Sequence, residues 1–212
     1  MSAERRGIPF VVAAPSGTGK TTVCHAVIAP DPLVDFSVSH TTRKPRANER
    51  DGVHYHFVSR RDFEKLVAEA AFLEWAEYNG NLYGTSWQAL ESALSRGHDV
   101  LLEIEVQGAA QVRQRRADAR SIFLLPPSME ALRARLLSRG TDSPAEVERR
   151  LAWAEREELP AGLGFDYAVV NDDLDTCVGQ VRAILEAERG GEVAPLRQRF
   201  DPEAALARLR EA

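Results

Sequence analysis

Ala14-Pro15-Ser16-Gly17-Thr18-Gly19-Lys20-Thr21-Thr22 joins two segments of different periodicity. The run before it, residues 8–13, is almost continuously apolar and predicts a short strand buried on both faces of a parallel sheet. After it, apolar residues recur at helical spacing until Pro30, which predicts a helix beginning near Lys20. A glycine-rich loop in this context favours phosphate binding, because its backbone N–H groups and the helix N-terminus face the same anion.

The residue types in this loop match the chemistry of a nucleotide phosphate site. Glycines let successive N–H groups turn inward, a lysine reaches the β- and γ-phosphates, and a hydroxyl binds Mg²⁺. The usual pattern has a glycine where Ala14 stands, and an alanine fits there if its φ is negative. The alternative is a surface turn that happens to contain a lysine. We predict an ATP site, with Lys20 catalytic and Thr21 holding Mg²⁺, formed by Ala14, Pro15, Ser16, Gly17, Thr18, Gly19, Lys20, Thr21 and Thr22.

Composition limits the class of protein. The 212 residues suit one α/β domain, and 44% hydrophobic with 28% charged residues is ordinary for a globular protein. A net charge of −5 argues against a broad basic surface for nucleic acid. No apolar run approaches the roughly 18 residues of a membrane span, and the polar start is too short for a signal peptide. Cys24 and Cys177 lie in apolar stretches, so we expect reduced core thiols and a cytoplasmic protein.

Strand and helix signals alternate along most of the chain. Buried-strand texture returns at residues 100–106, 121–125 and 168–170. Caps and apolar spacing predict helices at 86–96, 128–139, from Ser143 onward and at 175–188. Strands alternating with helices predict an α/β fold with a parallel, doubly wound sheet. For the C-terminus, a packing helix from Asp201 and a frayed tail both remain open.

The region between Phe36 and Tyr83 has a different texture. Val53, Tyr55 and Phe57 alternate with polar residues, which predicts antiparallel strands with one solvated face. Asp62 is the predicted N-cap of a following helix. We expect this region to be an excursion from the parallel sheet.

A cluster of charged and aromatic residues in the same region suits an acceptor that carries a phosphate group. Three cations lie within residues 43–46, and Pro45 keeps the segment out of a helix, so that the cations can converge on one anion. Taken alone, such a cluster is more often a solvated loop. Tyr55, and Tyr83 in a glycine-punctuated turn, can offer phenol hydroxyls to the same phosphate or pack half-buried.

Glu74 stands among large apolar residues in the segment 71–75. A carboxylate accepts two hydrogen bonds from the N1–H and N2–H₂ edge of guanine, whereas adenine presents an acceptor at N1. Burying that carboxylate without a partner is costly, so a site built around it rejects the wrong base. By itself, Glu74 also fits a helix-surface acid.

Six motifs, in order, resemble the guanylate kinase family over roughly residues 8 to 190: Ala14–Lys20, Ser37–Arg46, Asp51–Tyr55, Phe72–Trp75, Tyr83–Thr85 and Val170–Asp173. The element that contains Ser39 and Arg43 is much more specific than the phosphate loop. The resemblance implies a mobile lid and a GMP site in which arginines and tyrosines hold the phosphate while Glu74 and Thr85 read the guanine. The residues implied are Ser39, Arg43, Arg46, Glu49, Tyr55, Glu74, Tyr83 and Thr85.

Two further acids, Glu103 and Glu105, are spaced to share one face near the C-terminal end of a predicted strand, where ligands gather in open α/β sheets. Members of the family often carry Asp-x-Asp here, so the longer glutamates are a departure. We place both with the GMP site, as contacts to the acceptor or to Mg²⁺-bound water. The alternative is ion pairing with nearby arginines.

The segment 133–150 is dense in arginine, which suits transfer of a γ-phosphoryl group because guanidinium groups stabilise the charge on its equatorial oxygens. By resemblance, Arg135, Arg139 and Arg150 are catalytic candidates. Together with Lys20 and Arg43 they form the predicted catalytic set. A salt-bridged pair of amphipathic helices accounts for the remaining arginines. Asn171 is predicted to contact the adenine of ATP, with an ordinary Asx turn as the alternative.

These inferences predict a P-loop NTPase-type α/β enzyme that uses Mg²⁺ and ATP to phosphorylate GMP and dGMP. We expect a single domain with a core at about 8–36, 97–130 and 160–190, a mixed α+β GMP-binding subdomain at 37–95, a helical lid at 131–158 and a tail at 191–212. The alternatives are a ribose 1,5-bisphosphate phosphokinase and a non-catalytic interaction module of the same fold. The predicted partners are the nucleotides alone, without nucleic acid or membrane, and the oligomeric state is left open.

Overall fold

The computed structural model describes residues 5–46, 48–78, 80–138, 140 and 143–211. Among them are a larger sheet with strand order β2-β7-β1-β8-β9 and a smaller one with order β4-β3-β6-β5. The chain divides into two compact units, the first formed by Met1–Val11 with Pro32–Ala119 and the second by Val12–Asp31 with Arg120–Ala212. Strand β1 (Pro9–Ala13) crosses this division, and all its residues are buried, as its apolar sequence predicts.

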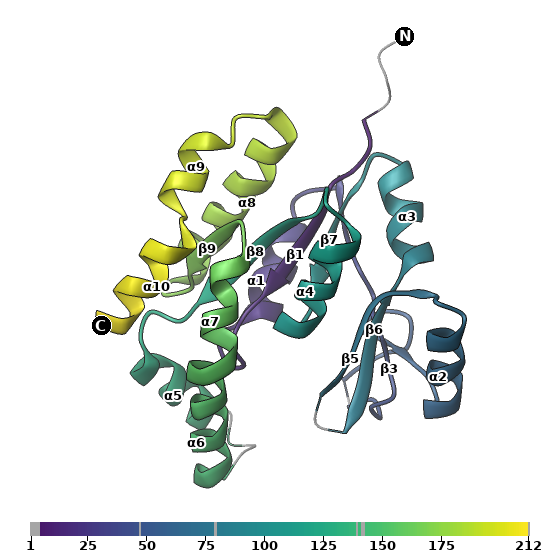
Figure 1. Cartoon of the computed structure of the whole chain (residues 1–212), viewed down its shortest axis with the longest axis horizontal. Coiled ribbons are helices and arrows are strands. Elements are labelled where there is room, and N and C mark those ends of the chain that lie inside the picture. Colours follow the sequence, from purple (N-terminus) through teal and green to yellow (C-terminus); the bar gives the residue numbers. More distant parts are fainter. Residues whose placement is uncertain (1–4, 47, 79, 139, 141–142, 212) are drawn as a thin grey trace. The chain divides into compact units, whose positions relative to one another are not determined.

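The first unit holds both β2 and β7 of the larger sheet and the whole smaller sheet. Figure 1 labels its strands β3, β5, β6 and β7 and its helices α2, α3 and α4. Strands β2 and β7 pair in parallel, with Val34 opposite Asp99. The elements are β2 (Val34–Phe36), β3 (His40–Thr41), β4 (His56–Phe57), α2 (Arg60–Ala68), β5 (Phe72–Tyr78), β6 (Asn81–Ser86), α3 (Trp87–Ser95), β7 (Asp99–Glu103) and α4 (Val106–Arg115).

The smaller sheet is mixed. Strand β6 pairs antiparallel with both β5 and β3, whereas β4 pairs with β3 in parallel. The prediction of antiparallel strands over 53–57 is therefore wrong: only His56 and Phe57 form a strand, and Val53 lies in a turn. Alternation of apolar and polar residues in the sequence does not by itself distinguish a turn from a strand: here Val53 is exposed, and residues 54–57 are all half-buried.

Helix α2 covers this sheet through a small apolar cluster. Phe63 stacks on Phe72 at a ring-centroid distance of 4.5 Å, and both pack with Leu82. The N-cap is Ser59, whose hydroxyl accepts a hydrogen bond from Asp62 N at 3.1 Å. Asp62 is thus not the cap that we predicted. It lies within the first turn, where an acidic side chain is also favourable.

A buried carboxylate fixes the start of the first unit. Asp99 is fully buried at the beginning of β7, accepts a hydrogen bond from Ile8 N at 2.8 Å and pairs with the Arg5 guanidinium. Removing the carboxylate leaves the part-buried Ile8 N–H group and the Arg5 guanidinium without this acceptor, which is a costly change.

We therefore expect Asp99→Ala to lower the free energy of unfolding by about 2–4 kcal/mol. The matched control is Asp35→Ala, because the Asp35 side chain is 35% exposed and pairs with Arg96 at the surface. Its effect should stay below about 1 kcal/mol. Urea denaturation of both variants measures the difference, and equal effects would contradict the assignment.

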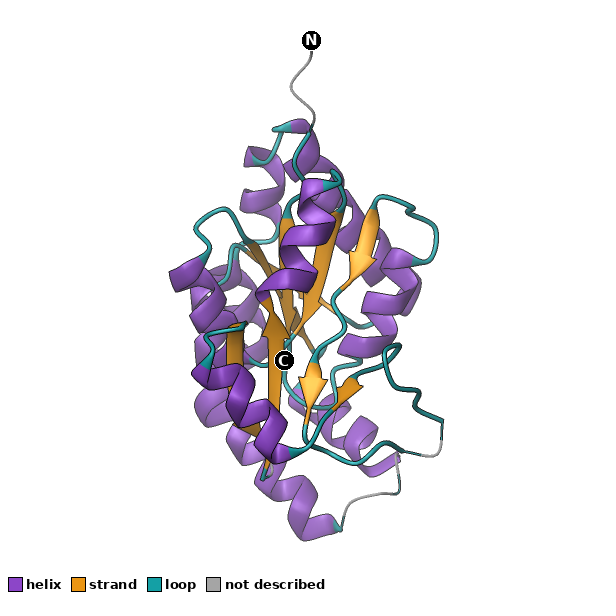
Figure 2. Ribbon diagram, turned by 90° about the vertical axis from the view of Figure 1, so that its right-hand side faces the viewer, coloured by secondary structure: helices purple, strands orange, loops and turns teal. Residues whose placement is uncertain are grey.

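The second unit holds the phosphate loop, the remaining strands and the C-terminal helices. Strands β8 and β9 pair in parallel, and α8 and α10 both contact β9. Figure 2 shows the strands in orange with the helices in purple. The elements are α1 (Lys20–Ile28), β8 (Arg120–Leu125), α5 (Met129–Ser138), α6 (Pro144–Trp153), a π-helix (Ala154–Glu158), α7 (Leu159–Ala161), a 3₁₀ turn (Gly162–Gly164), β9 (Tyr167–Val170), α8 (Leu174–Gly190), α9 (Ala194–Arg199) and α10 (Pro202–Glu211).

Helices α5 and α6, which we predicted as a lid, share an apolar cluster with the first residue of the π-helix: Leu132, Leu136, Val147, Leu151 and Ala154. The predicted caps are confirmed. Ser128 Oγ accepts from Ala131 N at 3.1 Å, and Ser143 caps α6 with Pro144 at its first turn.

The C-terminal segment is folded, which settles the open choice in favour of packing helices. Ala168 N of β9 donates to Phe200 O at 2.8 Å, and α10 packs on β8 and β9. Beside this contact, Tyr167 Oη donates to Glu188 at 2.6 Å, and burial raises the pKa of Tyr167 to about 12. Helix α9 was not predicted, whereas the helix at Pro202 was.

The predicted fold class, a parallel sheet flanked by helices with a separate mixed sheet, is confirmed. Cys24 and Cys177 are buried free thiols, as predicted. Across the described part of the chain, no helix combines the length and apolarity needed to cross a membrane.

Candidate active site

The phosphate loop lies in the second unit and bends through two left-handed glycines. Gly17 has a φ of 101° and Gly19 a φ of 97°, values that residues with a Cβ rarely adopt. Thr18 N donates to Pro15 O at 3.1 Å, which closes the turn, and α1 begins at Lys20 without a side-chain cap. Ala14 is not among the described residues with positive φ, so the alanine fits as predicted.

Two side chains hold the loop through the carbonyl oxygen of Thr18. Asn171 Nδ2 donates to this oxygen at 2.7 Å, and Arg135 donates to it at 3.3 Å. A Cβ atom on Gly17 would lie 2.9 Å from Leu136 Cδ2, so α5 packs directly against the loop. Asn171, 7% exposed, thus supports the loop, and its predicted contact with adenine stays a prediction.

The arginines of α5 and α6 fall into two groups. Arg135 reaches Thr18, and Arg150 donates to Ser16 Oγ at 3.3 Å, so both lie at the phosphate loop. Arg149 instead pairs with Glu146 at 2.6 Å, as the salt-bridged-helix interpretation expects. Arg139 lies outside the described residues.

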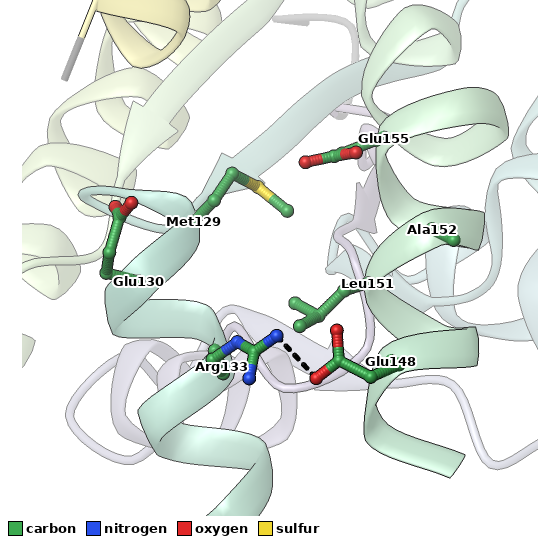
Figure 3. A pocket seen from close by; sticks show the side chains of 7 residues that line it. All are labelled: Met129, Glu130, Arg133, Glu148, Leu151, Ala152 and Glu155. Atoms are coloured by element: carbon green, nitrogen blue, oxygen red, sulfur yellow. Dashed lines mark ion pairs between the residues drawn. The ribbon is translucent and has the colours of Figure 1, made fainter. Parts of the chain in front are cut away.

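Arg133 belongs with Arg149, in the group of arginines that form ion pairs within the helix pair. It pairs with Glu148 across α5 and α6 at 2.5 Å, at the edge of a pocket between these helices (Figure 3). The pocket is lined by Met129, Glu130, Arg133, Glu148, Leu151, Ala152 and Glu155. None of these residues belongs to the predicted ATP or GMP sets.

The residues at the start of α1 fit an ion that arrives with a nucleotide. Thr21 and Thr22 are exposed in its first turn. Mg²⁺ is usually held by one or two protein oxygens together with substrate phosphates, and a hydroxyl on a phosphate loop is such a donor. Within residues 5–211, apart from the positions not described, no three or more His, Cys, Asp or Glu side chains are grouped to hold a metal ion.

The predicted base-reading residues meet in the first unit. Glu74 in β5 is 4% exposed, and Thr85 in β6 is fully buried and donates to Glu74 Oε1 at 2.6 Å. Ser39 Oγ lies 3.4 Å from Thr85 Oγ1. Because β5 is a strand and Glu74 is buried, the helix-surface interpretation of this acid is wrong.

A second group gathers around Arg43. Its guanidinium pairs with Glu49 at 2.7 Å and lies over the Tyr55 ring at 5.4 Å, while Tyr55 and Tyr83 meet edge to face at 6.0 Å. The hydrogen bond from Arg43 holds the pKa of Glu49 below its ordinary value, and the same bond raises the pKa of Arg43. Arg46 joins through its backbone N–H, which donates to Glu49 at 2.7 Å, and its side chain is exposed.

Two details of the predicted acceptor site are wrong. Glu103 ends β7, but Glu105 lies outside the strand as the N-cap residue of α4, so the two do not share a strand face. The predicted strand to residue 106 ends earlier because α4 begins at Val106. Tyr83 and Thr85 lie in β6 and not in a turn, since the turn stops at Gly80.

Sequence reasoning missed two side chains that hold β5. Gln111 of α4 donates to Trp75 O at 2.7 Å and accepts from Trp75 N at 3.3 Å. Arg115 donates to Leu73 O at 2.6 Å. Their spacing of four places them on one helix face, a signal that exists in the sequence but does not name its partner.

A buried strand, a loop with two left-handed glycines and a helix that begins at the loop lysine together define a P-loop nucleotide-binding protein. The family model described as guanylate kinase matches residues 6–188. The chain belongs to the guanylate kinase family.

Individual relatives agree with this membership. The chain is 51% identical over 189 residues to a guanylate kinase of Neisseria gonorrhoeae, covering 89% of this chain and 92% of the relative. It is 48% identical over 193 residues to one from Symbiobacterium thermophilum, covering 91% of each. A crystal structure of guanylate kinase from Anaplasma phagocytophilum superposes with a TM-score of 0.67 at 32% identity, covering 87% of each chain.

Proposed function

We propose that the residues described above carry out the transfer of the γ-phosphoryl group of ATP to GMP. As a member of the guanylate kinase family, the chain is an ATP:GMP phosphotransferase. The observation that carries the residue-level proposal is the buried pair of Glu74 and Thr85. A ribose 1,5-bisphosphate kinase has no base to read, so it has no use for this pair.

Guanine recognition follows from the chemistry of that pair. Thr85 donates to Glu74 Oε1, and a carboxylate with about four lone-pair sites can also accept from the N1–H and N2–H₂ groups of guanine. Adenine would place an acceptor against the carboxylate, leaving a buried charge poorly paired. Because none of these contacts involves the sugar, we propose dGMP as a second acceptor.

The GMP phosphate is assigned to Arg43, Tyr55 and Tyr83, with Arg46 as an additional cation. A planar guanidinium fixed by Glu49 is oriented before the substrate arrives, so less side-chain entropy is lost on binding. Glu49 is itself an anion and would repel the phosphate. We therefore propose that Glu49 orients Arg43 and does not touch the phosphate.

ATP is assigned to the phosphate loop and Lys20. The loop N–H groups and the start of α1 bind the phosphates, and Thr21 would hold Mg²⁺. When bound, Mg²⁺ neutralises charge on the β- and γ-phosphates. Arg135 and Arg150 donate to Thr18 and Ser16 of the loop, which supports assigning them to stabilise charge on the transferred group. The GMP phosphate is largely ionised near pH 7, because its second pKa is about 6, and needs no side chain as general base.

The wider context is also proposed. The buried free thiols suit a reducing compartment, so we place the protein in the cytoplasm. The net charge of −5 gives no support for nucleic acid as a partner. Nucleotides are the only partners that the proposed chemistry requires.

Glu74→Gln tests the base-reading assignment. An amide places an N–H₂ donor opposite one of the two donors of guanine, so one hydrogen bond is lost. We therefore expect kcat/KM for GMP to fall by about 10²-fold, mostly through KM. The matched control is Glu77→Gln on the same strand, since Glu77 is 52% exposed and pairs with Arg60. A coupled ADP-release assay with GMP, dGMP and AMP measures both. Equal losses in the two variants would contradict the assignment.

A further inference from the structure

We propose that Gly108, the third residue of α4, is a specificity-determining position because its missing side chain makes room for the carboxylate of Glu74. Gly108 acts through Glu74 and is therefore a positioning residue, not a catalytic one. The inference rests on the proposed function, in which Glu74 reads guanine.

The three atoms nearest to a Cβ at Gly108 all belong to the Glu74 side chain. An ideal Cβ atom on Gly108 would lie 2.4 Å from Glu74 Oε2, 3.1 Å from its carboxyl carbon and 3.6 Å from its Cγ. The first distance is far inside van der Waals contact. Gly108 is not among the glycines with positive φ, so its helical backbone does not itself require glycine.

The helix cannot retreat easily from the carboxylate. Gln111 and Arg115, which follow Gly108 on the same face of α4, bind the backbone of Trp75 and Leu73 on either side of Glu74. The opposite oxygen of Glu74 is fixed by Thr85 at 2.6 Å. Helix α4 and β6 therefore confine the carboxylate, and Gly108 leaves the room for it.

A methyl group at Gly108 should move Glu74 and leave the fold intact. The clashing atom is the far end of a flexible side chain, which can rotate, whereas no backbone atom lies among the three nearest neighbours. Alanine is also a better helix former than glycine. We expect Gly108→Ala to keep its melting temperature within about 4 °C of the parent protein.

The decisive experiment is a cycle of four proteins: the parent, Gly108→Ala, Glu74→Asp and the double variant. Gly108→Ala should raise KM for GMP at least about tenfold beside Glu74. Beside the shorter aspartate the same substitution should change KM less than about threefold, because the carboxylate no longer reaches the new methyl group. KM for ATP should stay within about twofold throughout.

Gly179→Ala is the matched control, because Gly179 lies inside helix α8 and an added Cβ would meet nothing within 4 Å. It should leave KM for GMP unchanged. The inference would be overturned if Gly108→Ala changed KM for GMP equally beside glutamate and beside aspartate, or did not change it beside glutamate. In either case, GMP turnover by the parent would leave the proposed function standing. A parent protein inactive towards GMP would overturn both.

Discussion

Lys20→Ala is expected to lower kcat by about 10³-fold, because a positioned cation at the developing charge contributes an effect of this order. Lys20 is the first residue of α1 and directly follows the left-handed Gly19. Lys20 therefore stands at the end of the loop in which the phosphates are proposed to bind. The loop N–H groups remain in the variant, so KM for ATP should rise much less than kcat falls.

Lys65→Ala is the control for this experiment. The Lys65 side chain is 74% exposed and makes only a long surface pair with Glu69 at 3.8 Å, so kcat should stay within about twofold. Circular dichroism and thermal unfolding of both variants show whether the fold is kept. A folded Lys20→Ala protein with nearly full activity would remove the phosphate loop from the proposed mechanism.

The parts of the fold that sequence reasoning predicted are those fixed by local chemistry. The phosphate loop is recognisable from its glycines, of which Gly17 and Gly19 adopt a positive φ. The start of α6 is recognisable from Ser143 and Pro144, because a capping hydroxyl and a proline both act within the first turn of a helix. The buried strands β1 and β8 are recognisable since parallel strands covered on both faces are continuously apolar.

The parts that it missed depend on contacts between distant segments. Whether Glu74 is a surface or a buried acid is decided by Thr85 on the next strand and by Gly108 on α4, not by its neighbours in sequence. Helix α9 was missed because it is short and depends on a distant contact. Its C-cap residue, Phe200, accepts a backbone hydrogen bond from Ala168 of β9. Glu105 was misplaced because an apolar run gives no sign of where a strand becomes a helix.

Two adjacent arginines of α6 differ in their exposure and contacts, and this difference gives the second large prediction. Arg149 and Arg150 both pair with Glu146, and Arg150 also donates to Ser16 of the phosphate loop at 3.3 Å. The Arg150 side chain is 22% exposed, against 68% for Arg149. Adjacent residues of a helix point about 100° apart, so the two side chains have different surroundings although they carry the same charge.

Arg150→Ala is therefore expected to lower kcat by about 10³-fold or more, with a smaller change in KM for ATP, because charge on the γ-phosphoryl oxygens is greatest in the transition state. Arg149→Ala should stay within about twofold, since the ion pair with Glu146 that it removes is largely exposed. Arg150→Lys should fall between the two, as it keeps the charge and loses the planar fork. Steady-state kinetics with GMP and varied ATP measure all three. If both alanine variants lose activity equally, the arginines stabilise the helix pair and do not act on the phosphoryl group.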